Sequence, residues 1–296
     1  MLLNTDYQTE QKQLDKHTDN NLDNDDDHDV GMCHSGRDRK QFYIKVLIVL
    51  LYQLFILNSV FYAFDYIPLI NQWIGEHIWS MYLLCLLNGY NAVVLLKIPT
   101  IEQFFPLNII ILSIFTICHS SIAANITYQT TTVDDIISIS IVLITSTILF
   151  SIATKFSYDI TIYFYQYFYI FTLSVIIIPA FMIIFTILGY EIILNKLLMV
   201  FAFIFFQFFT IITVQTLQGG HDVEVQIQDY VLGSMQMFIV ILCSSLSLST
   251  LFDRNSTEEY DFLKTIFLLF NIPLVYFSIL NNEVNMKKKL KKNNVA

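Results

Sequence analysis

Eight long apolar segments dominate the sequence between residues 42 and 280, and short polar stretches separate them. A helix needs about 20 mainly apolar residues to cross the hydrocarbon core of a bilayer, and most of these segments reach that length. The pattern therefore predicts a polytopic membrane protein. The predicted spans are Phe42–Phe64, His77–Leu96, Phe105–Asn125, Ile136–Ala153, Ile160–Ile187, Leu194–Leu217, Tyr230–Leu251 and Phe262–Leu280.

The predicted fold class is all-α, a transmembrane helical bundle of seven spans plus an additional C-terminal apolar segment. Backbone groups in lipid must satisfy their own hydrogen bonds, and segments of this length do so as helices and not as barrel strands. The short connections predict that neighbouring spans pack antiparallel. Pro179 and Pro273 predict kinks in segments five and eight, because each removes a helical hydrogen bond. Segment eight is short and contains Asn271 and Pro273, so whether it spans the bilayer is left open.

Composition agrees with a membrane protein. Of the 296 residues, 55% are apolar and 14% are charged, whereas a soluble domain has about 25% charged residues. Residues 1–30 carry nine acidic residues against two lysines, a net charge of −7, and no apolar run typical of a signal peptide. We expect four regions: a disordered acidic cytoplasmic tail (1–40), a seven-span membrane domain (41–251), the additional apolar segment (252–282) and a basic cytoplasmic tail (283–296).

Lysine and arginine at the ends of the spans predict the orientation. A basic cluster precedes the first segment and a second cluster follows the last, so both termini are expected in the cytoplasm and the number of crossings is expected to be even. Lys97 and Lys155 fall on predicted cytoplasmic turns, and the glycosylation sequons at Asn125 and Asn255 fall on the opposite side. The clusters are Arg37, Arg39, Lys40 and Lys45, and Lys287, Lys288, Lys289, Lys291 and Lys292.

Several kinds of chemistry are not expected. The sequence shows no basic face for nucleic acid. Its four cysteines lack the spacing of a metal site or a disulfide framework. No Gly-x-Ser-x-Gly, His-Glu-x-x-His or P-loop string occurs, so we predict neither an enzyme nor a cofactor.

Five short strings have the order and spacing of a known family. Tyr43–Val46 reads Tyr-Ile-Lys-Val, with Gln-Leu eight residues after the lysine. Phe105–Asn108 reads Phe-Pro-Leu-Asn, and Leu112–Thr116 then reads Leu-Ser-Ile-Phe-Thr. The remaining strings are Lys155–Thr161, which reads Lys-Phe-Ser-Tyr-Asp-Ile-Thr, and Thr213–Gln215, which is followed by a Gly-Gly pair and by Gln-Asp-Tyr at 228–230.

Over residues 38–251 the chain resembles the lifeguard branch of the transmembrane BAX inhibitor motif family. The resemblance implies a regulator of apoptosis and of organelle calcium in the endoplasmic reticulum or Golgi. It also implies, as partners, the lipid bilayer, membrane proteins of cell-death or calcium pathways, and calcium ions.

The chain departs from this family at the site that carries its chemistry. The family has two acidic residues in its last two spans, which share a proton and close the pore. The matching positions here are Thr213 and Val240, and neither side chain titrates. A second alignment, which starts from Glu258-Glu259-Tyr260, places Ser244 and Asn271 there instead. Both alignments lose the pair of acids, so the resemblance predicts a diverged member without a functional di-aspartate calcium latch.

Other polar residues within the spans are candidates for pH sensing or for lining a pore. His119 is the main one, because an ionisable residue inside a membrane often marks a functional site and imidazole titrates near neutral pH. The simpler interpretation is a neutral histidine bonded to the backbone of a neighbouring helix or to Ser120. Asn108 is a further candidate, with an interhelical hydrogen bond as the alternative. Gln215 is another candidate, at the end of a span where water is able to reach it. Asp159 is expected to cap the fifth helix.

The leading hypothesis is therefore a lifeguard-like membrane protein that regulates cell death and organelle calcium. The alternative is a secondary transporter or channel for another small solute. A calcium flux in reconstituted vesicles would favour the first hypothesis, and a solute-coupled flux without a calcium leak would favour the second.

Overall fold

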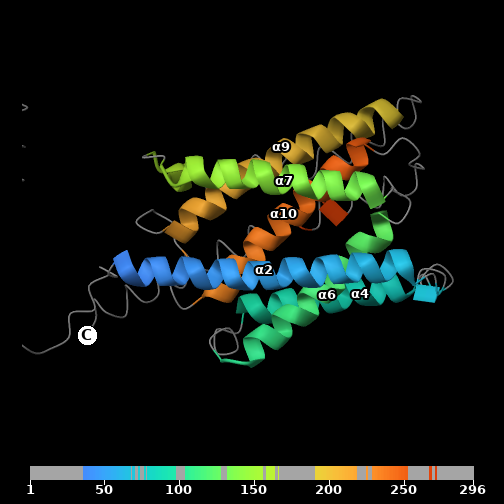
Figure 1. The fold of residues 1–296 in the computed structure, drawn as a ribbon, viewed down its shortest axis with the longest axis horizontal. Coiled ribbons are helices and arrows are strands. Elements are labelled where there is room, and N and C mark those ends of the chain that lie inside the picture. Colours follow the sequence, from blue (N-terminus) through green and yellow to red (C-terminus); the bar gives the residue numbers. More distant parts are fainter. Residues whose placement is uncertain are drawn as a thin grey trace, which may run out of the picture. The chain divides into compact units, whose positions relative to one another are not determined.

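The computed structural model describes most of the predicted membrane region. The chain divides into Met1–Ser35, which lies outside the described residues, and Gly36–Ala296. The regular structure that the model describes is entirely helical (Figure 1). The described residues are 36–67, 69–70, 73, 77, 79–97, 104–127, 132–155, 158–163, 166, 191–218, 225, 229–252, 267–268 and 271.

Six of the predicted spans correspond to helices with similar bounds. Most of the fifth and eighth predicted segments, and both predicted tails apart from residues 36–40, lie outside the described residues. Helix α2 begins six residues before the predicted Phe42, because its first turns are polar and the prediction followed the apolar residues alone. The helices are α2 (Gly36–Tyr66), α4 (Trp79–Lys97), α6 (Leu107–Thr127), α7 (Thr132–Ala153), the short 3-10 helix η1 (Ile160–Tyr163), α9 (Glu191–Gln218) and α10 (Tyr230–Phe252).

By length and composition, four of the described helices are able to cross a membrane: α2, α6, α9 and α10. The apolar parts of α4 and α7, Tyr82–Leu96 and Ile137–Ala153, are shorter. Large apolar side chains on α2 and α4 are exposed, among them Leu51, Phe55 and Leu86, which are 65%, 71% and 72% accessible. A surface of this kind is unfavourable in water and favourable against lipid tails. These features fit an integral membrane protein.

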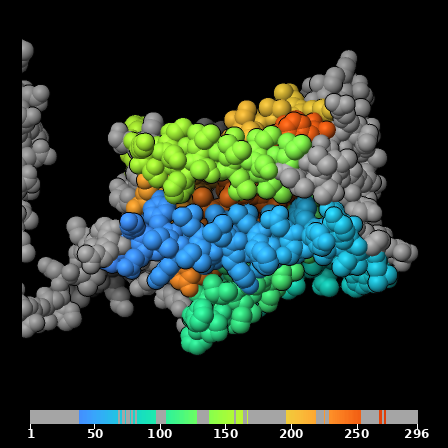
Figure 2. Space-filling view, viewed as in Figure 1, coloured from blue at the N-terminus to red at the C-terminus, as the bar shows by residue number. Residues whose placement is uncertain are grey.

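Helix α10 is the central helix of the described bundle. It packs against α2, α6, α7 and α9, and every residue from Val231 to Thr250 is buried. In Figure 2, α7 and α2 cover most of this helix, which shows only in small patches beside them. This central helix nevertheless carries buried polar side chains, among them Gln236 and Ser244.

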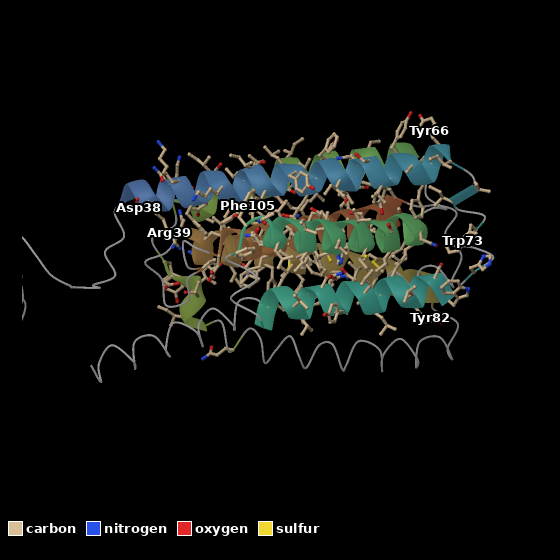
Figure 3. All side chains as sticks on the ribbon, turned by 90° about the horizontal axis from the view of Figure 1, so that it is seen from below. Asp38, Arg39, Tyr66, Trp73, Tyr82 and Phe105 are labelled. Carbon is tan, nitrogen blue, oxygen red and sulfur yellow. The ribbon has the colours of Figure 1, made fainter. Side chains whose placement is uncertain are left out.

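Contacts between helix ends show how the helices alternate in direction. Arg39 at the start of α2 bonds to the end of α9, Tyr43 on α2 packs against Phe150 near the end of α7, and Asn108 at the start of α6 bonds to Tyr230 at the start of α10. We call this the Arg39 end. Figure 3 shows Asp38 and Arg39 at this end of α2, with Tyr66 at the other end.

The opposite end, which we call the Trp73 end, joins the end of α2 to the start of α4. Phe64 near the end of α2 packs in one cluster with Ala124 near the end of α6. Trp73 and Trp79 pack edge to face between α2 and α4, with ring centroids 6.0 Å apart. Helices α2, α6 and α10 therefore run from the Arg39 end to the Trp73 end, and α4, α7 and α9 run in the opposite direction. This arrangement agrees with the predicted antiparallel packing of neighbouring spans.

Candidate functional site: the polar interior around α10

The interior of the bundle is unusually polar for a helix assembly of this hydropathy. Each of the helices α2, α4, α6, α7, α9 and α10 contributes at least one buried polar side chain. Many of the serines and threonines are satisfied within their own helix, since the hydroxyl donates to a carbonyl three or four residues earlier. Examples are Thr116 to Leu112, Thr210 to Phe206 and Ser247 to Cys243. These residues need no ligand.

A second set of buried polar atoms has no hydrogen-bond partner. Such atoms are costly to bury, about 1–3 kcal/mol each, so each calls for a partner such as water or a ligand. We call the residues that carry them the polar interior. They are Gln53, Ser80, Asn88, His119, Ser120, Ser146, Gln207, Thr213, Gln236, Ser244 and Asn271.

Amides, hydroxyls and one imidazole make up this set, and no carboxylate belongs to it. Among the side chains that the structure describes, Asp229 is the only buried acid. It lies directly before α10, and its backbone carbonyl accepts a hydrogen bond from the Gly233 amide. The described residues contain no group of three His, Cys, Asp or Glu side chains that is able to hold a metal ion. The interior therefore offers neutral hydrogen-bonding groups and not the charged oxygen ligands that calcium sites use.

The two positions that match the family's acids are both inside this interior. Thr213 on α9 and Val240 on α10 are fully buried, and these two helices pack against each other. The Thr213 hydroxyl has no partner, although a threonine hydroxyl in a helix is able to donate to a carbonyl of its own helix. The Thr213 carbonyl instead accepts a hydrogen bond from the hydroxyl of Thr216, at 2.8 Å.

The second alignment also leads to neutral groups. Ser244 and Asn271 are fully buried, and the Ser244 hydroxyl and the Asn271 side-chain oxygen lack partners. The amide nitrogen of Asn271 donates to the Phe267 carbonyl at 2.8 Å. Neither alignment brings an acid into the described interior.

His119 lies deep in the bundle, on α6. Its ring is fully buried, and its Nδ1 lies 2.9 Å from the amide nitrogen of Asn88 on α4. The ring packs against Phe115, Phe238 and Phe267, with centroid distances of 5.2, 6.0 and 5.0 Å. His119 therefore bonds to a neighbouring helix, but its partner is the Asn88 side chain and neither of the two expected partners, a helix backbone or Ser120.

Asn108 and Gln215 lie near the Arg39 end, away from the centre of the helices. Asn108 donates to the hydroxyl of Tyr230 at 3.3 Å, which links the starts of α6 and α10. Gln215 on α9 accepts from the Ile160 amide at 3.0 Å and donates to the Tyr158 carbonyl at 2.9 Å. Asn108 therefore makes an interhelical hydrogen bond, which was the alternative to a pore-lining role. Gln215 is fully buried and joins α9 to the segment before and at η1, although it was expected within reach of water.

Asp159 lies directly before the short helix η1. Its carboxylate accepts hydrogen bonds from the Thr161 amide at 2.8 Å and from the Thr161 hydroxyl at 2.6 Å. The expected cap is confirmed for this turn, and most of the predicted fifth span that follows lies outside the described residues.

Arg39 makes the most extensive polar contact in the described structure, and sequence reasoning used it only to set orientation. Its guanidinium donates to the carbonyls of Gln218, Val225 and Thr216, at 2.8, 2.9 and 3.2 Å. Two of these carbonyls belong to the last turn of α9, where a cation is favoured by the free carbonyls and the helix dipole. The signal in the sequence was present but ambiguous, because an arginine before an apolar segment equally marks a cytoplasmic flank.

Comparisons of the chain with protein-family models, with curated proteins and with solved structures found no match.

Proposed function

We propose that this chain is a diverged lifeguard-like membrane protein that regulates cell death and organelle calcium without a carboxylate latch of its own. The proposal comprises seven spans plus the additional C-terminal segment, a location in the endoplasmic reticulum or Golgi membrane, and cytoplasmic termini. The observation that carries it is the pair Thr213 and Val240, both fully buried on the packed helices α9 and α10.

Two carboxylates at such a site would share one proton, because both cannot ionise cheaply in a medium of low dielectric. Their shared proton would make the contact sensitive to pH, and their oxygens would bind calcium. A threonine and a valine provide neither property. The chain is therefore proposed to act on calcium and cell death through other membrane proteins, and not through its own gated leak.

The distribution of basic residues supports the proposed orientation. Lys40, Lys45, Lys97 and Lys155 all belong to helix ends or turns on the Arg39 side of the described bundle, whereas Lys196 near the start of α9 belongs to the opposite side. An excess of lysine and arginine marks the cytoplasmic side of a membrane protein. The Arg39 end is accordingly proposed to face the cytoplasm.

Calcium flux through the purified full-length chain, reconstituted in vesicles that contain a calcium dye, tests the missing latch. The parent is expected to show no pH-dependent calcium leak above that of protein-free vesicles. The variant Thr213→Asp with Val240→Asp is expected to gain one, because two buried carboxylates share a proton and at least one of them titrates at a raised pKa. Thr213→Asn with Val240→Asn is the matched neutral control and should show no pH-dependent calcium leak.

The regulatory role is tested in cells that express the chain. Depletion should change the calcium content of the organelle store and the threshold for stress-induced death, and the parent should restore both. Unchanged store calcium and unchanged survival after depletion would reject the regulatory proposal. A steep pH-dependent calcium leak through the parent in vesicles would reject the proposal that the chain lacks a latch of its own.

The second candidate is a channel or transporter for a small neutral solute. The amide groups of Gln207 and Gln236 and the side-chain oxygen of Gln53 have no partner and favour it, because they present donors and acceptors without charge. Stopped-flow swelling of the same vesicles in urea or glycerol tests this function. Uptake faster than in protein-free vesicles, without a calcium leak, would support it.

A further inference from the structure

Helix α2 has one face that packs inside the described bundle and an opposite face that does not. The packed face contains Phe42, Val46, Leu50, Gln53 and Leu57, all of which are buried. Of the four helices that are able to cross a membrane, α2 is the least buried, with 28% of the residues in its most apolar stretch buried against 44% for α9. Figure 2 shows α2 along the outside of the described bundle. The outer face of α2 is therefore available to lipid or to another protein.

A row of side chains, which we call the outer row, follows the centre of this exposed face. Successive members are alternately four and three positions apart, as are the a and d positions of a coiled coil. Residues at this spacing lie on one stripe, because two turns of an α-helix take about seven residues. The outer row has the geometry of a seam between two helices that run side by side. Its members are Ile44, Ile48, Leu51, Phe55, Asn58 and Tyr62, and each of them is exposed.

Asn58 is the member of the outer row that lipid does not satisfy. Its amide nitrogen donates to the Leu54 carbonyl of its own helix at 2.8 Å, and no other described residue bonds to its side-chain oxygen. The exposed hydroxyls nearby already have partners, Ser59 within its own helix and Tyr52 on α6. Tyrosine favours the level where a bilayer meets water. With Tyr66 at that level, Asn58 lies about 12 Å deeper along the helix, where an amide needs a polar partner from another protein surface.

A second copy of this chain offers such a partner at the same depth. Copies inserted with one orientation place their α2 helices parallel, related by a twofold axis perpendicular to the membrane. Each member of the outer row then faces the same residue of the other copy. An amide is complementary to itself, because it has two N–H donors and an acceptor oxygen. Two Asn58 side chains therefore satisfy each other, and a single polar residue in such a seam also fixes its register.

We infer that the outer row of α2 is the contact surface of a homodimer in the membrane, in which the two Asn58 side chains hydrogen-bond to each other. This inference goes beyond the proposed function. It rests on α2 crossing the bilayer and does not depend on calcium.

Photo-crosslinking of the full-length chain, in the membranes of cells that express it, identifies what covers the outer row. A benzophenone amino acid takes the place of Phe55, or of Ile148 on the exposed face of α7 as the control. The Phe55 position should give a product of twice the mass of the chain, in which peptide mapping joins α2 to α2, and the Ile148 position should not. Products that contain only lipid, or a different protein, from the Phe55 position would overturn the inference.

Energy transfer in lipid vesicles, between copies labelled with donor or acceptor at the N-terminus, tests the role of Asn58. Transfer in the parent should persist when the protein is diluted with lipid, and its loss on dilution would reject the dimer. Asn58→Leu should weaken the association about 3- to 30-fold, the range for one interhelical hydrogen bond in a membrane. Asn58→Gln keeps the amide and should retain part of the association.

Thr147→Val is the matched control, because it removes a polar group from the exposed surface of α7 and should leave the association unchanged. An association of Asn58→Leu as strong as that of the parent would overturn the bond between the two amides. If Asn58→Leu does not fold, the dilution series of the parent and the crosslink at position 55 decide between a dimer and a lipid-covered face.

Discussion

At the scale of single residues, the buried polar side chains differ in whether they bond within one helix or between two. Many serine and threonine hydroxyls bond to their own helix, as in Ser234 to Val231 at 2.7 Å, whereas those of Thr213 and Ser244 have no partner. Some longer side chains reach another helix, as in Gln53 on α2, which donates to Thr116 on α6 at 3.2 Å. The loss of a residue that joins two helices should therefore weaken the packing of both.

The pair formed by His119 and Asn88 provides a test of this view. Either His119→Leu or Asn88→Leu leaves the other member buried with a further unpartnered group, so each should lower stability by about 1–3 kcal/mol. The double variant removes both polar groups and should lose less than the sum of the two single losses. The thermal midpoint of the detergent-solubilised protein gives the three values. Strictly additive losses would mean that the two side chains do not interact.

Substitution of Arg39 should lower the stability of the protein more than substitution of another basic residue before the first span. Arg39→Met removes three hydrogen bonds to α9 and its following segment, and the loss should be at least about 1.5–3 kcal/mol, the range for hydrogen bonds to a charged group. Arg39→Lys keeps the charge but not the planar fork, so it should recover only part. Lys40→Met is the control, since Lys40 is exposed. Equal midpoints for Arg39→Met and Lys40→Met would show that the contact contributes nothing.

The sequence identified candidate polar residues but not their partners. His119, Asn108 and Gln215 all stood out as polar groups in or at the ends of apolar segments. Their partners lie 31, 122 and 55 or more residues away in the chain, and a sequence without its fold does not indicate which distant helices meet. The role of Arg39 was not predicted for the same reason. It binds backbone carbonyls, which every residue has, so the sequence does not indicate which ones it contacts.

At the scale of helices, apolar length was sufficient to predict the elements. Six predicted spans match helices within a few residues, because a continuous apolar run of this length has one stable form in lipid. The central position of α10 was not predicted. Its composition is as apolar as that of α6, yet α6 keeps an exposed face and α10 does not. That difference arises from packing, which helix length does not determine.

Gly233 marks a close approach between α10 and its neighbours. A Cβ atom built there would lie 2.6 Å from a Leu217 methyl carbon on α9 and 3.4 Å from a Val46 methyl carbon on α2. Gly233→Ala should stay within about 1 kcal/mol of the parent, because the gain in helix propensity offsets a small shift of the flexible Leu217 side chain. Gly233→Leu should lose about 1–3 kcal/mol by overpacking. Adding Leu217→Ala to Gly233→Leu should recover part of that loss, and no recovery would place the clash elsewhere.

At the scale of the whole described bundle, the two ends differ in chemistry. The Arg39 end carries lysine and arginine, whereas the Trp73 end carries aromatic rings that are exposed. Tyr62 and Tyr66 stack at 4.2 Å, and Trp73 stacks on His77 at 4.9 Å. Tryptophan and tyrosine concentrate where a bilayer meets water, because their rings are apolar and their tips are polar. The basic end and the aromatic end are thus compatible with helices that cross a bilayer.

The tryptophans allow this arrangement to be tested without a label. The chain contains only two, Trp73 and Trp79, and both are exposed. Figure 3 shows Trp73 at the Trp73 end, and Trp79 packs against it there, with ring centroids 6.0 Å apart. All intrinsic tryptophan fluorescence therefore reports on that end. If the ring planes lie at the level of the lipid carbonyls, bromine atoms placed high on the acyl chains should quench the emission more than bromine atoms placed near the bilayer centre. The single variants Trp73→Phe and Trp79→Phe assign the signal to each ring.

Quenching that is strongest from the bilayer centre would place this end inside the hydrocarbon. Quenching by aqueous iodide with no effect of brominated lipid would place it in water. Either result would contradict an interfacial aromatic end, and with it the bilayer position proposed for the six helices that the structure describes.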